Sequence, residues 1–236
     1  MLEEVKKRVC KANLELVAHG LVTLTWGNVS ELAPDGRVFV IKPSGVPYEE
    51  MKPEHMVVVD LDGKVVEGAF RPSSDTEIHK VLYREFKGVG GITHMHSPWA
   101  TAFAQARVEI PCLGTTHADH FMGPVPVTRP PTREELDAGY ELNTGRVIVE
   151  RFRGINPLET PAVLVAGHGP FTWGKDSAES VKNAVALEAV AMMAHATLQL
   201  RHDTLPLLED YVLDKHYQRK HGLNAYYGQK GRPPPA

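Results

Sequence analysis

Two histidine motifs in the chain have the residue types and spacing of a metal site. His94 and His96 lie in the apolar run 91–97, which is predicted as a strand, and His168 follows the apolar run 162–166 in the sequence Gly-His-Gly. Residues i and i+2 of a strand point to the same side of a sheet, and flanking glycines let the backbone turn towards a ligand. Three imidazoles around a zinc ion leave one position open, as catalysis requires.

Other interpretations of these histidines compete with a metal site. Each motif alone is typical of a surface pair or an ordinary turn, but the two together favour a metal site, with Asp75 as a candidate fourth ligand that substrate could displace. No HExxH motif supports a metalloprotease. An HxH pair also occurs in amidohydrolases, but those enzymes usually use a longer barrel chain, and no eightfold βα pattern is present here.

Segments rich in glycine, serine and asparagine lie next to predicted strand ends, at 26–30, 42–45 and 72–75. Hydroxyl groups, free backbone N–H groups and a helix N-terminus suit an anion, and Lys42 adds one full charge. Each segment could equally be a turn or a helix cap. Only in combination with a metal site do they favour a phosphate group.

The elements that must position these residues follow from periodicity and capping signals. The pairs Ser74/Glu77 and Asp176/Glu179 have the spacing of capping boxes. Helices are predicted over 2–16, 75–86, 98–106, 176–201 and 207–221, and strands over 22–26, 38–42, 56–61, 91–97, 146–152 and 162–166. The mixture predicts an α/β/α layered domain around a mixed or mostly antiparallel sheet.

Composition limits the classes of protein. The chain has 236 residues, a formal net charge of −3 and 42% hydrophobic residues, which fit one globular α/β domain and give no sign of a nucleic-acid or membrane partner. Neither GxGxxG nor GxxxxGK[ST] occurs. Cys10 and Cys112 show no paired spacing, and no secretory leader or membrane span is evident, so a cytoplasmic protein is expected. We expect one domain over 1–229 and a disordered tail over 230–236.

Several longer motifs, taken in order, resemble the L-ribulose-5-phosphate 4-epimerase family of class II aldolase-like and adducin-like proteins. The resemblance runs from the first helix to Gln229. The matching segments are 21–30 (LVTLTWGNVS), 38–45 (VFVIKPSG), 72–76 (PSSDT), 94–97 (HMHS), 114–119 (GTTHAD), 168–171 (HGPF), 214–222 (DKHYQRKHG) and 225–229 (AYYGQ).

The resemblance implies a class II aldolase-like fold, a cyclic homotetramer with active sites between subunits, and an epimerase that breaks and re-forms C3–C4 of a pentulose 5-phosphate. It implies one zinc ion per subunit, with Mn²⁺ or Co²⁺ as possible substitutes, held by His94, His96 and His168 beside Asp75. The implied phosphate site consists of Gly27, Asn28, Lys42, Ser44, Gly45, Ser73 and Ser74. Asp119 and Tyr227, reaching in from a neighbouring subunit, are the implied acid/base pair, with Thr115, Glu141 and His216 as supporting site residues.

The chain departs mildly from the family pattern, with Met95 where threonine is common and His120 where tyrosine is common. The nearest rival is a sugar-phosphate aldolase of the L-fuculose-1-phosphate type, in which glutamate stands at the position of Asp75. The Thr-His-Ala-Asp119 motif and the Tyr-Tyr-Gly-Gln segment also favour the epimerase. A non-catalytic adducin-like protein is disfavoured because the ligand set is intact. Arabinose and ascorbate catabolism both remain open as pathways.

Overall fold

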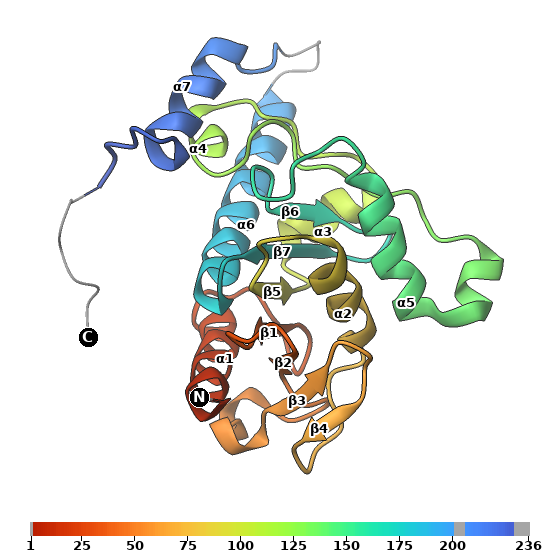
Figure 1. The fold of residues 1–236 in the computed structure, drawn as a ribbon. Coiled ribbons are helices and arrows are strands. Elements are labelled where there is room, and N and C mark those ends of the chain that lie inside the picture. Colours follow the sequence, from red (N-terminus) through yellow and green to blue (C-terminus); the bar gives the residue numbers. More distant parts are fainter. Residues whose placement is uncertain (1, 201–205, 229–236) are drawn as a thin grey trace.

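In the computed structural model of the chain, residues 2–200 and 206–228 are described, and helices cover both faces of one central sheet (Figure 1). The predicted tail 230–236 and the predicted helix end at Arg201 lie outside these ranges. The helices are α1 (Leu2–Ala18), α2 (Thr76–Glu85), α3 (Pro98–Ala106), α4 (Thr115–Ala118), α5 (Arg133–Arg151), α6 (Ser177–Leu200) and α7 (Asp210–His221), with 3-10 turns at Tyr48–Glu50 and Pro53–His55.

The sheet has seven strands in the order β4-β3-β2-β1-β5-β7-β6, and every neighbouring pair of these strands is antiparallel. At its centre β1 pairs with β5 so that Asn28 lies opposite His94. The strands are β1 (Asn28–Leu32), β2 (Val38–Ile41), β3 (Val57–Asp60), β4 (Val65–Glu67), β5 (Gly91–His94), β6 (Ala162–Leu164) and β7 (Pro170–Gly174).

The two faces of the sheet pack against different helices. Along β6, Ala162 and Leu164 join the core beneath α1, α3 and α6, whereas Val163 joins the core beneath α2 and α5. This alternation is what a strand buried on both faces requires. The predicted α/β/α layering around a mostly antiparallel sheet is therefore confirmed.

The strand predicted at 22–26 is wrong: this segment is a loop, and the strand begins at Asn28. Leu24 and Gly27 have positive φ angles, of 53° and 77°, which no strand accommodates. The strand β1 was not predicted because it carries buried polar residues. Ser30 is hydrogen-bonded to His79, and Glu31 is hydrogen-bonded to Ser177. These partners from distant segments allow polar side chains to be buried that the local sequence pattern predicts to be exposed.

The strand predicted at 146–152 is also wrong, because this segment is the last part of α5. The helix begins at a capping box in which Thr132 and Glu135 exchange side-chain and backbone hydrogen bonds. A Cβ added at Gly145 would lie only 2.9 Å from the Cβ of Val81. A glycine at this point therefore lets α5 approach α2 closely.

Several boundaries near the site differ from the predictions. Asp75, not Ser74, is the N-cap of α2, and no side-chain capping bond forms there. The strand predicted at 91–97 ends at His94, so His96 follows the strand instead of belonging to it. The strand predicted at 162–166 ends at Leu164, and α7 begins at Asp210 instead of 207. Within the described ranges, no helix has the length and apolar character needed to cross a membrane.

Candidate metal centre and anion cradle

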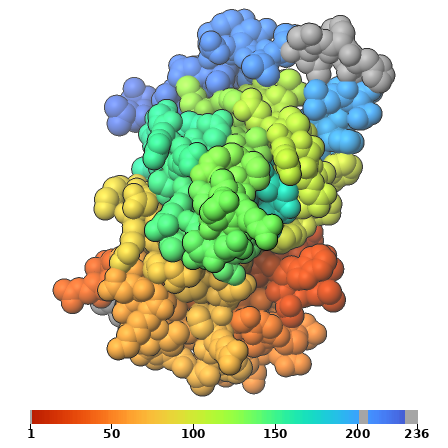
Figure 2. Space-filling model, turned by 90° about the vertical axis from the view of Figure 1, so that its right-hand side faces the viewer, coloured from red at the N-terminus to blue at the C-terminus, as the bar shows by residue number. Residues whose placement is uncertain are grey.

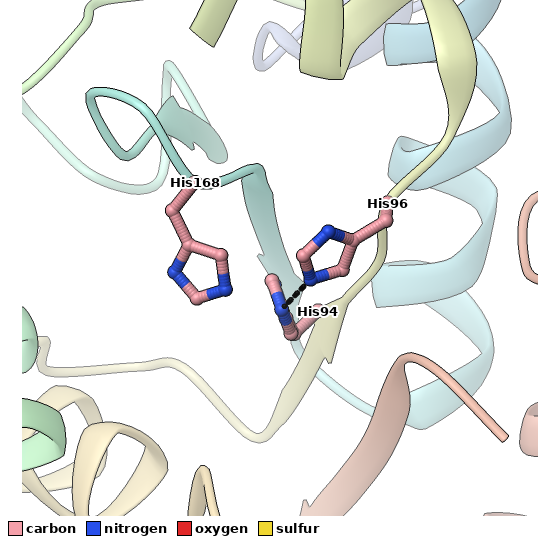
Figure 3. Close-up of side chains that lie close together, drawn as sticks. All are labelled: His94, His96 and His168. Carbon is pink, nitrogen blue, oxygen red and sulfur yellow. Dashed lines mark hydrogen bonds between the residues drawn. The ribbon is translucent and has the colours of Figure 1, made fainter. Parts of the chain in front are cut away.

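Three histidines from two neighbouring strand ends converge in one place (Figure 3). His94 ends β5, His96 follows two residues later, and His168 lies on the turn before β7. One nitrogen from each imidazole lies within 4.8 Å of the other two, and the Nε2 atoms of His94 and His96 are 3.0 Å apart. Met95, between them, packs into the core beneath α3 and α6, as strand alternation predicted.

The protonation of these rings suits a cation. The Nδ1 of His94 is 2.9 Å from the carbonyl oxygen of Pro170, which can only accept, so Nδ1 carries the hydrogen and Nε2 presents its lone pair to the site. Burial lowers the pKa of His94 and of His168 to about 3 and lowers the pKa of His96. Neutral imidazoles with converging lone pairs are the donor set that a divalent transition metal prefers, so the residues fit a metal ion.

Asp75 completes the polar surroundings of the histidines. Its Oδ2 lies 3.9 Å from Nε2 of His94 and accepts a hydrogen bond of 2.6 Å from Nδ2 of Asn28. One helical turn later, the buried His79 contacts Ser30, which in turn contacts Tyr83. The Asp75 carboxylate is therefore oriented by Asn28 of β1.

The predicted anion segments form one cradle beside the histidines. Two of them are tied together by the hydrogen bond from the N–H of Ser73 to the carbonyl oxygen of Lys42 and by that from the N–H of Ser44 to the carbonyl oxygen of Arg71. Asp75, the N-cap of α2, makes no side-chain capping bond, and Ser74 next to it lines the same cavity as the three histidines. The N-terminus of α2 opens at the same place, which favours negative charge.

Lys42 is the cation of this cradle. Its side chain is buried, its Nζ donates to the carbonyl oxygen of Thr25 at 2.9 Å, and the ammonium lies 4.8 Å from the ring centre of Tyr48. Burial lowers the pKa of Lys42 to about 8, although Asp75 opposes that shift. The buried ammonium is therefore stabilised when an anion binds beside it.

The structure brings the predicted metal and phosphate residues together in a single cavity of about 540 Å³. Glu141 of α5 also lines this cavity, and α5 lies on the face of the molecule that Figure 2 shows. The complete set of predicted residues in the lining is Gly27, Asn28, Lys42, Ser44, Gly45, Ser73, Ser74, Asp75, His94, His96, Glu141 and His168.

Sequence reasoning missed Thr25 and Tyr140 of the lining, and it placed Trp26 in an anion segment without naming it as a site residue. Thr25 and Trp26 were assigned to a strand that does not form. Tyr140 follows a glycine within a helix, and an isolated glycine at that point was the only local signal.

The remaining predicted residues form a second cluster away from this cavity. Asp119 ends α4, beside Thr115, and His216 of α7 contacts its carboxylate at 3.1 Å. Asp119 also accepts two hydrogen bonds from Arg219, and together with Tyr227 it lines a separate cavity of about 550 Å³. Within one chain, the proposed acid/base pair therefore does not reach the histidines.

Burial alone would raise the pKa of the Asp119 carboxyl, but hydrogen bonds from Arg219, His216 and Lys220 outweigh it and hold the pKa at about 2. The ammonium of Lys220 lies 4.5 Å from the ring centre of Tyr227. Basic side chains of α7 therefore contact both groups of the cluster, the ionised carboxylate of Asp119 and the ring of Tyr227.

Comparisons with known proteins agree with this arrangement. Residues 7–195 match the family model "Class II Aldolase and Adducin N-terminal domain". The chain is 53% identical over 229 residues to L-ribulose-5-phosphate 4-epimerase UlaF of Salmonella paratyphi C (strain RKS4594), an alignment that covers 97% of this chain and all of that protein.

Solved structures show the same fold. An L-fuculose 1-phosphate aldolase superposes with a TM-score of 0.77 at 25% identity, covering 92% of this chain and 95% of that one. YgbL of Klebsiella pneumoniae, described as a putative aldolase/epimerase/decarboxylase, superposes with a TM-score of 0.72 at 26% identity, covering 91% and 98%. The chain therefore belongs to the class II aldolase and adducin family.

Proposed function

We propose that the chain is an L-ribulose-5-phosphate 4-epimerase that interconverts L-ribulose 5-phosphate and D-xylulose 5-phosphate, working as one catalytic domain over residues 1–229. The observation that carries this proposal is the single cavity in which three neutral imidazoles lie beside a cradle for a phosphate group. The match over the full length of UlaF supports the epimerase reaction.

The position of the reacting carbon favours cleavage of a carbon–carbon bond. The hydrogen on C4 is one carbon too far from the C2 carbonyl to be acidic, whereas breaking C3–C4 leaves an enediolate and an aldehyde. A bound divalent metal, for which we propose zinc with Mn²⁺ or Co²⁺ as substitutes, would supply the Lewis acidity that stabilises the enediolate charge. His94, His96 and His168, with Asp75 beside them, are the residues proposed to hold it.

The cradle has the second task in this scheme. Glycolaldehyde phosphate, the aldehyde fragment, must turn and present its other face before C3–C4 forms again. Lys42 and the hydroxyl groups of Ser44, Ser73 and Ser74 would hold its phosphate during the turn, with Asn28 and Gly45 beside them. Retention of the fragment is what separates an epimerase from an aldolase that releases its products.

Proton transfer is assigned to the second cluster. Asp119, ionised because its pKa is held at about 2, would take the proton of the C4 hydroxyl as the bond breaks on one face. The Tyr227 hydroxyl would give a proton to the C4 oxygen when the bond re-forms on the other face, and the roles exchange in the reverse direction. Exchange with solvent would then remove the proton from Asp119 and restore that of Tyr227 before the next turnover. Because neither group reaches the cavity of its own chain, we propose a homotetramer in which a neighbour supplies them.

The activity is tested by a coupled assay for D-xylulose 5-phosphate formed from L-ribulose 5-phosphate, with and without a metal chelator. Epimerisation that stops with chelator and returns with zinc is the expected result. A parallel assay with L-fuculose 1-phosphate tests the rival. Cleavage of this ester without any epimerisation would assign the chain to the aldolases instead.

Ligand assignments are tested separately, by elemental analysis of His94→Asn, His96→Asn and His168→Asn. Each variant is expected to lose bound metal. Stoichiometric zinc in all three would contradict the assignment. Subunit sharing is tested by mixing two inactive variants, His96→Asn and Tyr227→Phe. Activity should return in mixed tetramers, and its absence in tetramers shown to be mixed by native mass spectrometry would refute the shared site.

A further inference from the structure

Tyr140 contacts a proposed metal ligand from outside the metal centre. Its hydroxyl oxygen lies 3.2 Å from Nδ1 of His168, and the two rings are 6.1 Å apart. Tyr140 also lines the cavity that holds the three histidines. Among the described residues, its hydroxyl is the one hydrogen-bond partner found for the His168 ring.

A break in helix α5 places Tyr140 there. Gly139 has φ 142° and ψ 103°, a conformation open to glycine and rarely to other residues. Side chains beyond the break bond to the carbonyl groups around it: Asn143 donates to Glu135 and Gly139, and Thr144 donates to Tyr140. The break is therefore supported on its C-terminal side, and Tyr140 is the first residue after it.

The orientation of the His168 ring gives this contact its meaning. Nε2 of His168 points towards the other two imidazoles, and Nδ1 points away from them (Figure 3). A neutral imidazole that offers its Nε2 lone pair carries its hydrogen on Nδ1. That hydrogen meets the Tyr140 hydroxyl oxygen, as the hydrogen on Nδ1 of His94 meets the carbonyl oxygen of Pro170.

His168 has more need of such support than His94. The ring of His94 stacks on Phe171 at 4.2 Å and is held by a strand, whereas His168 stands on a turn between Gly167, with φ 73°, and Gly169. Backbone hydrogen bonds from Gly167 to Ala104 and from His168 to Val165 hold this turn, but they do not orient the imidazole. A hydrogen bond that His168 donates to Tyr140 of helix α5 fixes both the tautomer and the orientation of the ring.

We propose that Tyr140 is a positioning residue for the metal centre: its hydroxyl accepts a hydrogen bond from Nδ1–H of His168 and so orients Nε2 towards the ion. The inference rests on the metal centre of the proposed function. The break at Gly139 brings that hydroxyl to the site.

The test is a titration of metal-free protein with zinc in competition with a chromophoric chelator. Tyr140→Phe keeps the ring and removes only the hydroxyl, and it should bind zinc about tenfold more weakly, as loss of an outer hydrogen bond to a ligand does. Gly139→Ala should weaken zinc binding too, because alanine disfavours the φ of 142° at this break. The added Cβ would meet nothing closer than 3.9 Å, so no steric clash contributes. Tyr211→Phe, a change at a tyrosine 75% exposed on α7, is the matched control and should bind as the wild type does.

The melting temperature of each metal-free variant separates positioning from a role in folding. Tyr140→Phe should melt with the wild type, and a large fall would overturn the inference by showing that the hydroxyl supports the fold. Unchanged zinc affinity in Tyr140→Phe, with a wild type that binds zinc, would overturn the inference alone. A wild type that binds no zinc would overturn the metal centre of the proposed function together with it.

Discussion

Replacement of Lys42 by methionine should make the metal-free protein more stable and a poorer binder of phosphate. The lysine is 2% exposed, and burial lowers its pKa from 10.5 to about 8. At pH 7 the folded chain therefore holds a charge at a cost of about 3 kcal/mol relative to the unfolded chain, from about 1.4 kcal/mol per pKa unit. Loss of the hydrogen bond to Thr25 offsets about 1 kcal/mol of this, so the expected net gain is about 2 kcal/mol.

The sign of the pH dependence follows from the direction of the shift. Because the pKa is lower in the folded chain, the cost is fully present below pH 8 and disappears as the pH rises towards the unfolded value. The advantage of Lys42→Met should therefore be large at pH 7 and small or absent at pH 10. Urea unfolding of metal-free protein at both pH values and one chain concentration measures it.

Two further measurements complete the test of Lys42. Lys87→Met, at an exposed lysine, should change stability little at either pH. Inorganic phosphate should stabilise the wild type by binding the folded state and should stabilise Lys42→Met much less. A Lys42→Met protein that is less stable than the wild type at pH 7, or equally favoured at pH 7 and pH 10, would refute the reasoning.

Three other predictions concern backbone and charge. In Gly27→Ala, the new Cβ would lie 2.9 Å from the carbonyl oxygen of His94 at a φ of 77°, so zinc affinity and melting temperature should both fall. Burial raises the pKa of Asp119, but hydrogen bonds led by that from Arg219 hold this pKa at about 2. The ionised carboxylate therefore contributes about 2 kcal/mol to stability above pH 4, and this contribution is lost as the pH falls through 2. Asp119→Asn should remove this dependence on pH, which urea unfolding from pH 5 to pH 2 detects. Gly145→Ala should destabilise the protein by about 1–3 kcal/mol in the same assay, because the added methyl group overpacks the contact between α5 and α2; unchanged stability there would contradict the close packing.

The parts of the site that sequence could predict are those with a local signal. His94, His96 and His168 stand at apolar segments and the serines stand at turns, and the combination of these signals predicted a site. Glu141, by contrast, was predicted from the family resemblance alone. That twelve predicted residues share one cavity is consistent with those signals, although their individual roles remain predictions.

The parts that sequence could not predict depend on contacts between distant segments. β1 is buried at the sheet centre although it contains Ser30 and Glu31, because His79 and Ser177 satisfy them from other elements. Tyr140 reaches the site only because Gly139 breaks the helix, and no spacing rule ties it to a histidine 28 residues later. Nor does any local pattern reveal that Asp119 contacts His216 and Arg219 of α7.

The pairing of β1 with β5 limits which parts of the site can change. Asn28 of the cradle stands opposite His94 of the metal centre in this pairing, with β-sheet hydrogen bonds on either side. The separation between Asn28 and His94 is thus set by strand register, and a slip of one residue would turn every side chain of the strand to the opposite face. The serines of the cradle stand instead on the segments 42–45 and 72–75, outside the strands. Sequence change in this scaffold should therefore reshape the loop side of the cavity far more readily than the pair formed by Asn28 and His94.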